Sequence, residues 1–342
     1  MAATIVAATI IKKGIVMLVI NQKTTSPSFN LALEEYLFKH TSQDYFMLWR
    51  NERSIIVGKN QNTYAEINYK FVSDNKIPVI RRITGGGAVF HDLGNLNFTF
   101  IKRGQRDTFN NYEYFTRPVV ELLQSLGVPA ELSGRNDLLI AGMKFSGNAQ
   151  CADNSGILHH GTLLFDADMS SLSDALNVNP LKLKSKSIRS VRSRVTNISE
   201  HLPRKISIEE FSDLLIKKII DSNADAVPHK LTPDDIDTVK TLEQDKYSTW
   251  EWNYGSRLPF SFKKEMLFDS CHLEVNLDIK DNKIRSAKIF GDFFGQKDVS
   301  ELEQALCNTQ YREDALLEII KNFNIEEYFS GLSAEQFMKV LM

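Results

Sequence analysis

The spacing of apolar positions predicts a helix near the start of the chain. In residues 26–41 the apolar side chains recur three and four positions apart, which is the spacing of one helical face. Ser26 can cap this helix, and Pro27 suits its first turn. The apolar stripe consists of Phe29, Leu33, Tyr36 and Leu37.

Strand patterns follow this helix. Two short apolar runs and one segment in which apolar and polar residues alternate predict three strands, at 53–58, 78–83 and 95–101. A helix is then expected near 110–126, and Gly127 is a plausible left-handed residue at its end. Pro118 lies inside this stretch and can begin, bend or divide the helix.

The same patterns continue through the middle of the chain. Strand signals recur at 137–149 and 157–165. Residues 207–221 predict a helix, because Ser207 and Glu210 have capping-box spacing. Another helix is expected to start at Thr232-Pro233, by the same logic as at Ser26-Pro27.

The pattern changes near 255–268. Residues 270–280 alternate as a strand, Asp281-Asn282 offers a turn, and a second strand returns from there. Three helical segments complete the chain, at roughly 299–307, 312–322 and 333–341. A hairpin followed by helices can form a compact α+β unit. We therefore predict two domains, at 17–262 and 263–342.

Composition narrows the class of protein. The chain has 342 residues and a formal net charge of −2, so a general polyanion-binding surface is not expected. The three cysteines, Cys151, Cys271 and Cys307, are far apart in sequence, which favours a reducing compartment over a disulfide framework or zinc site. Lys12 and Lys13 interrupt the apolar N-terminal stretch, so it resembles neither a secretory signal nor a membrane span. We expect a cytoplasmic protein with no nucleic-acid or membrane partner.

Three consecutive glycines within residues 81–100 mark the first candidate site. Glycine is entropically costly, so Gly85-Gly86-Gly87 needs a reason: either a turn with positive φ or close approach of backbone amides to an anion. Arg81 and Arg82 directly upstream favour the anion, because guanidinium groups bind phosphate in bidentate fashion. No GK[ST] follows, and Phe90 breaks the GxGxxG spacing, so the stretch matches neither standard nucleotide motif.

Two later stretches carry further candidates. Lys144 lies between Gly142 and Gly147 among apolar residues, which suggests a lysine brought inward on a strand. His159 and His160 are adjacent, so on a strand they point to opposite faces and make a poor shared metal pair. We interpret an inward histidine here as a core or substrate-edge group.

These stretches together resemble the lipoate–protein ligase A family. The resemblance rests on RRITGGGAVFHDLGN (81–95), GRNDLLIAGMKFSGNAQ (134–150) and HHGTLLFDADMSSL (159–172), in this order, with support from LWRNERSIIVGKNQN (48–62) and SIRSVRSRVTN (187–197). It runs from about residue 20 to the C-terminus. It implies an α/β (α+β) protein, with a biotin/lipoyl ligase-like mixed-sheet catalytic domain and a small α+β C-terminal domain.

The resemblance also implies a set of site residues. Nucleotide contacts would come from Arg82 and from the segment Gly87, Ala88, Val89 and Phe90. Gly85 and Gly86 would shape the lipoyl pocket, and Lys144 would touch both the lipoate carboxylate and the adenylate phosphate. Asn136 and Asp137 would lie near the adenine and the metal-bound phosphates, with Asp137 as the metal ligand. Thr84 stands where many relatives carry serine, which keeps a hydroxyl.

The implied reaction uses ATP and Mg²⁺ to convert lipoate to lipoyl-AMP, followed by transfer to a lysine of an acceptor protein. The implied acceptors are lipoyl domains of 2-oxoacid dehydrogenase acyltransferase subunits and the H protein of glycine cleavage. Bringing a carboxylate to a phosphate requires cationic and amide groups that offset the repulsion, which fits Arg82, Lys144 and the glycine amides.

Alternatives remain open at this point. A transferase of the same fold would move octanoyl or lipoyl groups through a cysteine thioester, for which Cys151 is the nearest thiol. A non-catalytic lipoate binder would keep the pocket without turnover, and the GRGRxG-type segment of biotin ligases is absent. The basic run at 180–195 is either a solvated loop or a lid that meets the adenylate or an acidic acceptor; its cations are Lys182, Lys184, Lys186, Arg189, Arg192 and Arg194.

Overall fold

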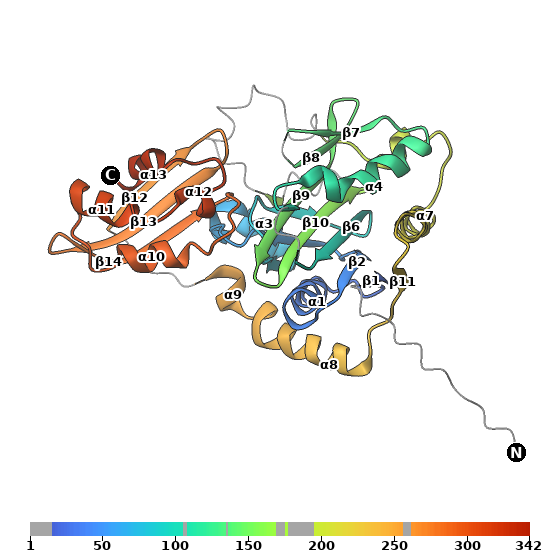
Figure 1. Cartoon of the computed structure of the whole chain (residues 1–342), viewed down its shortest axis with the longest axis horizontal. Helices are drawn as coiled ribbons and strands as arrows, with labels where there is room; N and C mark the ends of the chain where they lie inside the picture. The colour runs from blue at the N-terminus through green and yellow to red at the C-terminus, as the bar shows by residue number, and fades with distance from the viewer. Residues whose placement is uncertain (1–15, 105–107, 135, 169–174, 177–194, 256–260) are drawn as a thin grey trace, which may run out of the picture.

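The computed structural model describes residues 16–104, 108–134, 136–168, 175–176, 195–255 and 261–342. The basic residues predicted as a loop or lid, Lys182 to Arg194, lie outside them. Figure 1 shows a larger N-terminal body joined to a smaller C-terminal unit, for which we use residues 261–342.

An eight-stranded mixed sheet forms the centre of the larger body. Its two pairings around β1 are parallel and the others are antiparallel. In spatial order the strands are β11 (Ala226–Pro228), β1 (Met17–Asn21), β2 (Asp44–Trp49), β6 (Asn95–Lys102), β10 (Gly156–Leu164), β9 (Met143–Asp153), β8 (Asp137–Ile140) and β7 (Ala130–Ser133).

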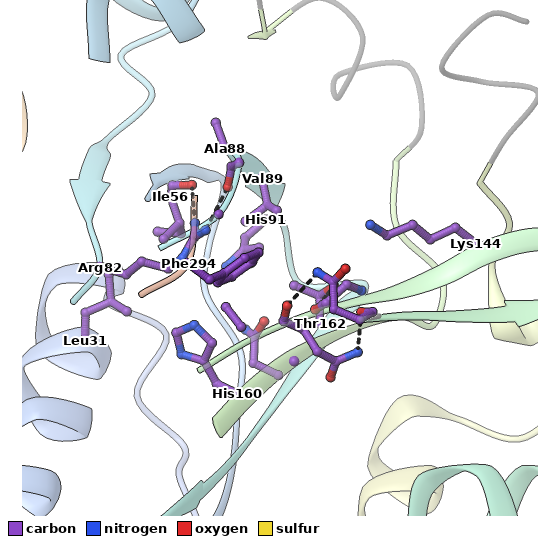
Figure 2. A pocket seen from close by; sticks show the side chains of 18 of the residues that line it. Leu31, Ile56, Arg82, Ala88, Val89, His91, Lys144, His160, Thr162 and Phe294 are labelled. Atoms are coloured by element: carbon purple, nitrogen blue, oxygen red, sulfur yellow. Dashed lines mark hydrogen bonds between the residues drawn. The ribbon is translucent and has the colours of Figure 1, made fainter. Parts of the chain in front are cut away.

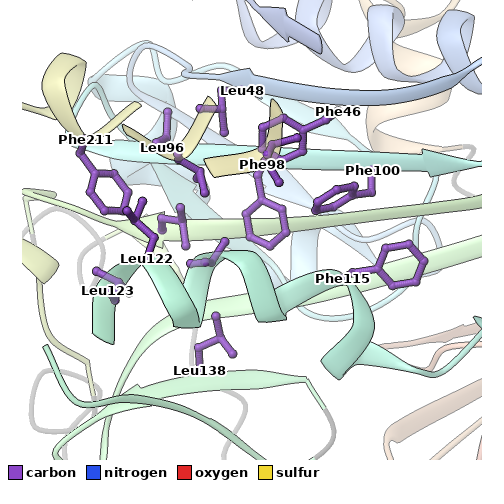
Figure 3. Close-up of a cluster of buried hydrophobic side chains, with 14 of the residues drawn as sticks. Phe46, Leu48, Leu96, Phe98, Phe100, Phe115, Leu122, Leu123, Leu138 and Phe211 are labelled. Atoms are coloured by element: carbon purple, nitrogen blue, oxygen red, sulfur yellow. The ribbon is translucent and has the colours of Figure 1, made fainter. Parts of the chain in front are cut away.

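Helices cover both faces of this sheet. On one face, α4 (Tyr112–Ser125) and α7 (Ile208–Ser222) pack against alternate residues of β6, including Phe98 and Phe100 (Figure 3). On the other face lie α1 (Pro27–His40) and α8 (Pro233–Leu242). The alternation predicted for 95–101 therefore separates two buried faces, and the polar positions of β6 are buried as well.

A second, three-stranded sheet lies beside the first in the larger body. Its order is β4 (Val79–Arg81), β3 (Ser54–Val57) and β5 (Val89–His91). Two short helices, α2 (Thr63–Glu66) and α3 (Tyr69–Asp74), connect β3 to β4. The connection from β4 to β5 contains the three glycines, so this small sheet fixes both ends of the glycine loop, for which we use residues 84–88.

Local capping explains several helix starts. Ser26 caps α1 by accepting a hydrogen bond from the Phe29 amide, as predicted. Thr232 and Asp235 form a reciprocal capping box on α8. Ser207 accepts from the Glu210 amide, but the Glu210 side chain turns to Arg204 instead of completing a box. Helix α4 continues through Pro118, and Gly127 beyond it has φ +84.

The C-terminal unit is a three-stranded antiparallel sheet covered by helices. The predicted hairpin is β13 (His272–Lys280) and β14 (Lys283–Gly291), and β12 (Phe262–Leu267) adds a strand that the pattern did not predict. The turn residues Asp281 and Asn282 both have positive φ. The covering helices are α10 (Ser300–Leu306), α11 (Glu313–Ile320), α12 (Ile325–Tyr328) and α13 (Ala334–Leu341). This unit has its own buried apolar cluster.

The predicted mixed α/β class is confirmed by this architecture. Between α8 and β12 the chain passes through a short π-helical turn at Glu243–Tyr247 and helix α9 (Trp250–Tyr254). A 3-10 turn at Ile198–His201 precedes α7. Among the described helices, none is long and apolar enough to cross a membrane.

Candidate functional site

Of the two reasons that the sequence offered for three glycines, the structure shows the positive φ, while the approach of backbone amides to an anion stays a prediction. Gly86 has φ +90, a region that disfavours other residues. Gly85 allows close backbone approach, because a Cβ there would lie 2.2 Å from the carbonyl oxygen of Phe293 in the C-terminal unit. A Cβ on neighbouring Gly58 would lie 2.0 Å from the Gly86 carbonyl oxygen. The loop is thus packed tightly against protein backbone on two sides.

Arg82 organises this loop from within. Its Nη2 donates to the carbonyl oxygens of Gly85 (2.6 Å) and Gly87 (2.8 Å), and its Nη1 donates to that of Ile56 (3.2 Å). Nε donates to the Thr84 hydroxyl at 3.0 Å. Burial lowers the pKa of Arg82 to about 10, so the guanidinium remains charged at neutral pH.

Arg81 lies outside the cavity and has a different role. Its guanidinium donates to the carbonyl oxygens of Gly58, Gln61 and Asn253, among others, and to the Thr63 hydroxyl. These bonds join the segment after β3 to α9. The pair of arginines in the sequence therefore divides into one residue that holds the scaffold and one that holds the glycine loop.

A cavity of about 660 Å³, counting its open mouth, lies between the glycine loop and the central sheet. Its sheet side is formed by residues of β6, β10 and β9, such as Asn97, Thr162 and Ala149. Figure 2 shows Lys144 on one side and Arg82, His160 and Phe294 on the other. Phe294 comes from the C-terminal unit, so both parts of the chain build the wall.

Most of the predicted site residues gather at this cavity. Arg82, Gly86, Gly87, Ala88, Val89, Asn136 and Lys144 line it. Phe90, by contrast, is 4% exposed and packs in a separate apolar cluster with Ile55 and Val57. Gly85 lies against Phe293. Asp137 is not in the lining but reaches it through Lys144.

Lys144 and its neighbours lie on a hairpin made of β8 and β9. Ala141 and Gly142 form its two-residue turn, both with positive φ, which splits the run predicted as strand at 137–149. The Lys144 ammonium is 2.7 Å from Asp137 Oδ1, and both side chains are 38% exposed. Asn136 donates its side-chain amide to the Asn148 carbonyl, which ties β8 to β9 beside the cavity.

The two histidines of β10 face opposite sides of the sheet, as predicted. His159 stacks on Phe115 of α4, and burial lowers its pKa well below the ordinary value. His160 faces the cavity, with Nδ1 against Glu34 of α1 and Nε2 against Thr84. Among the described residues no group of three histidine, cysteine or acidic side chains is arranged to hold a metal ion.

Glu34, His91 and Phe294 are among the residues at this site that sequence reasoning missed. Glu34 carries no motif and is brought in only by the packing of α1 on the sheet. His91 lines the cavity beside Trp49, and burial with nearby Arg82 and His160 lowers its pKa to about 3. Phe294 is distant in sequence from every predicted motif. Only His91, inside the 81–100 stretch, carried a signal that could have identified it.

Cys151 does not have the environment of an activated thiol. It lies on β9 and packs against the apolar cluster under α1, away from the cavity lining. Burial raises its pKa to about 12, despite the opposing effect of Lys59 and Lys39. A thioester mechanism requires the thiolate at neutral pH, so this position does not support the transferase alternative.

Comparison with known proteins identifies the family of this chain. The model of the lipoyl protein ligase A/B catalytic domain matches residues 26–220, and that of the bacterial lipoate protein ligase C-terminus matches residues 258–341. Lipoate-protein ligase LplJ of Bacillus subtilis is 44% identical over 325 residues, which cover 94% of this chain and 98% of the relative.

Solved structures agree with these matches. Plasmodium falciparum LipL1 in complex with lipoate has a TM-score of 0.74 at 26% identity, covering 94% of this chain and 97% of that one. A bipartite ligase from Thermoplasma acidophilum, reported with its E2 lipoyl domain, has a TM-score of 0.64 at 27% identity (73% and 100% covered). A lipoate-protein ligase A bound with ATP has a TM-score of 0.61 at 27% identity (70% and 98% covered). The chain therefore belongs to the lipoate–protein ligase family of enzymes.

Proposed function

We propose that the protein activates lipoate with ATP and then transfers the lipoyl group to a lysine of an acceptor protein. In the first step a lipoate carboxylate oxygen attacks the α-phosphorus of ATP. The bond between the α-phosphorus and the oxygen that bridges it to the β-phosphorus breaks, and lipoyl-AMP and pyrophosphate result. In the second step the acceptor amine attacks the lipoyl carbonyl, AMP leaves, and the amine loses a proton.

The observation that carries this proposal is a cavity whose wall combines Lys144 with apolar side chains and a few other polar groups. Lys144, Asn136 and Gly147 line one part of the wall. Leu31, Ile56 and Phe294 are among the apolar residues of the remainder. An acyl chain with a terminal carboxylate fits that combination, since a few polar groups can fix its orientation while apolar side chains bind the rest.

The backbone amides of the glycine loop also support the proposal. Because trans peptides are planar, carbonyls turned toward Arg82 direct the N–H groups of Gly86 and Ala88 to the opposite side. The amides of Gly86, Gly87 and Ala88 have no hydrogen-bond acceptor among the described residues. Such amides are suited to phosphate oxygens, so nucleotide contact is assigned to the backbone of Gly87 and Ala88, together with Arg82. Val89 and Phe90 would extend this segment, and Gly85 and Gly86 would shape the lipoyl pocket.

Lys144 is the proposed catalytic residue. Its ammonium would contact the lipoate carboxylate and then the charge that develops on the α-phosphate. Asp137 would release Lys144 as the substrates enter, because a second anion competes for the same cation. Asn136, fixed by Asn148, would contribute near the adenine.

Asp137 is also the residue proposed to meet Mg²⁺. One half-exposed carboxylate beside the cavity fits this ion, since Mg²⁺ in nucleotide sites takes one or two carboxylates and completes its shell with phosphates and water. When bound, Mg²⁺ would neutralise phosphate charge. The chain's own contribution is to present the carboxylate and to exclude water from the mixed anhydride.

The proposed acceptors are lipoyl domains of 2-oxoacid dehydrogenase acyltransferase subunits and the glycine cleavage H protein. The archaeal relative reported with its E2 lipoyl domain supports the first class. We further propose that residues 17–262 form the catalytic domain and residues 263–342 an accessory domain, and that the enzyme acts in the cytoplasm.

The test is purified enzyme with ATP, Mg²⁺, lipoate and each acceptor in turn, read by intact mass of the acceptor and by pyrophosphate release. We expect pyrophosphate release that depends on lipoate, and addition of one lipoyl group to at least one acceptor. Lipoyl transfer without ATP would overturn the proposal. Tight lipoate binding with no pyrophosphate and no modified acceptor would also overturn it, in favour of a binder.

A further inference from the structure

A chain of buried hydrogen bonds begins at Glu34 on α1. Its side chain is 1% exposed, and its carboxylate oxygens lie 3.0 and 3.1 Å from His160 Nδ1. The Thr99 hydroxyl donates to the same carboxylate at 2.6 Å. On the far side of the imidazole, His160 Nε2 lies 2.8 Å from the Thr84 hydroxyl.

Thr84 is the first residue of the glycine loop, and the hydrogen bonds continue from it to Arg82. The hydroxyl accepts a hydrogen bond from Arg82 Nε at 3.0 Å. The same guanidinium holds the carbonyl oxygens of Gly85 and Gly87 through Nη2. Four side chains, Glu34, His160, Thr84 and Arg82, therefore connect helix α1 to the glycine loop; we call them the positioning chain.

The geometry determines which atom donates in each hydrogen bond of the positioning chain. A carboxylate can only accept, so His160 Nδ1 donates to Glu34. With a neutral imidazole, Nε2 then accepts from the Thr84 hydroxyl, whose oxygen accepts in turn from Arg82 Nε. A doubly protonated imidazole would aim a second donor at the Thr84 oxygen and leave the hydroxyl hydrogen without an acceptor in the chain.

The two ends of the positioning chain carry opposite charges. Arg82 is 6% exposed and Glu34 is 1% exposed, so two opposite charges are buried without direct contact. An isolated buried charge is costly. His160 and Thr84 lie between them and orient each charge by hydrogen bonds, and Glu34 acts to keep the guanidinium protonated against its burial.

Carboxylate, imidazole and hydroxyl in series also describe a nucleophile-activating triad. Thr84 does not act in this way. Its hydroxyl oxygen already accepts from Arg82, the residue is completely buried, and it does not line the cavity. No substrate atom placed in the cavity can reach it in this arrangement.

We infer that Glu34, His160 and Thr84 are positioning residues that act through Arg82 on the glycine loop. They fix the rotation of the guanidinium, and the guanidinium fixes which way the peptide groups after Gly85 and Gly87 face. Substrate activation is then sensitive to a hydroxyl that no substrate touches. The kinetic part of this inference rests on the proposed lipoate activation.

Thr84→Val is the selective test, because it removes the hydroxyl with little change in shape. We expect kcat for lipoate-dependent ATP–pyrophosphate exchange to fall roughly 10- to 100-fold, as misplacement of a binding loop does, and KM for lipoate to rise as well, because the same loop is proposed to shape the lipoyl pocket. Thr84→Ser keeps the hydroxyl and should stay within about threefold of wild type. Thr116→Val makes the same change at another buried threonine, on α4, and should leave both constants unchanged.

Selective ¹⁵N-histidine NMR of the full-length protein tests the positioning chain independently of catalysis. We expect His160 to carry its proton on Nδ1 in the wild type and on Nε2 in Glu34→Gln, whose amide can donate to Nδ1. An Nε2 proton in the wild type overturns the proton order even if the enzyme is fully active.

The kinetic outcomes are equally decisive. Wild-type kcat in Thr84→Val, or an equal loss in Thr116→Val, overturns the positioning role. An enzyme with the expected tautomer but no pyrophosphate exchange in any variant contradicts the proposed function while the buried chain itself is confirmed.

Discussion

The ammonium of Lys144 lies 2.7 Å from a carboxylate oxygen of Asp137, across the first pairs of the β8–β9 hairpin. Both side chains are 38% exposed, so the pair is accessible to substrate and partly screened by water. A pair of this kind stabilises the fold little, which leaves both groups available for exchange. The Asp137 carboxylate thus neutralises the Lys144 ammonium until a second anion competes for it.

Lys144→Ala should abolish most of the activation chemistry. We expect lipoate-dependent pyrophosphate exchange to fall on the order of 10²–10³-fold, as when one transition-state donor is removed, with little change in the melting temperature. Lys218→Ala breaks an exposed ion pair with Glu121 on α4 and serves as the matched control. Near-normal exchange in Lys144→Ala would remove this residue from its proposed role.

Phe294→Ala tests whether the C-terminal unit contributes to substrate binding. The ring lines the cavity and is 6% exposed, so its removal takes away part of an apolar wall and should raise KM for lipoate several-fold. Phe323→Ala alters a ring that packs on the apolar cluster of the same unit. If both variants change lipoate KM equally, the effect reports stability of the unit and not the cavity wall.

Acid should destabilise the protein through two buried histidines. Burial lowers the pKa of His91 to about 3 and that of His159 well below its ordinary 6.5. Below pH 6.5 the unfolded chain binds protons that the native state does not. The free energy of unfolding therefore falls as pH drops from 6.5 toward 3, by up to about 1.4 kcal/mol per pH unit for each histidine.

Urea unfolding between pH 7 and 4.5 measures this slope. His91→Asn should reduce the slope by up to the contribution of one proton, about 1.4 kcal/mol per pH unit. Replacement of exposed His40 by Gln should not change the slope. An unchanged slope in His91→Asn would mean that His91 is protonated, or exposed, in the native state.

Cys151→Ser should leave ATP-dependent lipoylation unchanged. Because burial raises the pKa of this thiol, little thiolate is present at pH 8, and alkylation by iodoacetamide should be slow in the folded enzyme. Rapid alkylation at neutral pH, together with loss of activity in the serine variant, would revive the thioester mechanism.

The roles of the site residues came from the family resemblance, whereas the features that the residues themselves predicted are all encoded locally. Ser26-Pro27 marks a helix start, three glycines mark a constrained loop, and Lys144 stands next to glycines that permit a tight hairpin. Capping, positive φ and strand alternation depend on neighbours within a few residues, so they can be read without the fold.

The remainder of the site depends on long-range packing. Glu34 and His160 are 126 positions apart and meet only because α1 crosses the strand next to β6. Phe294 reaches the cavity from a different unit. The polar positions of β6 alternate with apolar ones, yet α1 covers them, and Thr99 there donates to Glu34. No local pattern distinguishes a buried polar face from a solvated one.

The contact of Gly85 with the Phe293 carbonyl has a thermodynamic consequence. The loop proposed to hold the nucleotide is also a surface on which the C-terminal unit rests, helped by the ion pair of Lys59 with Asp298. Two events that share one surface are linked, and the linkage is reciprocal. If docking of the unit shifts substrate affinity by some factor, bound substrate must shift docking by the same factor. Affinities measured on the intact chain therefore contain the free energy of that docking.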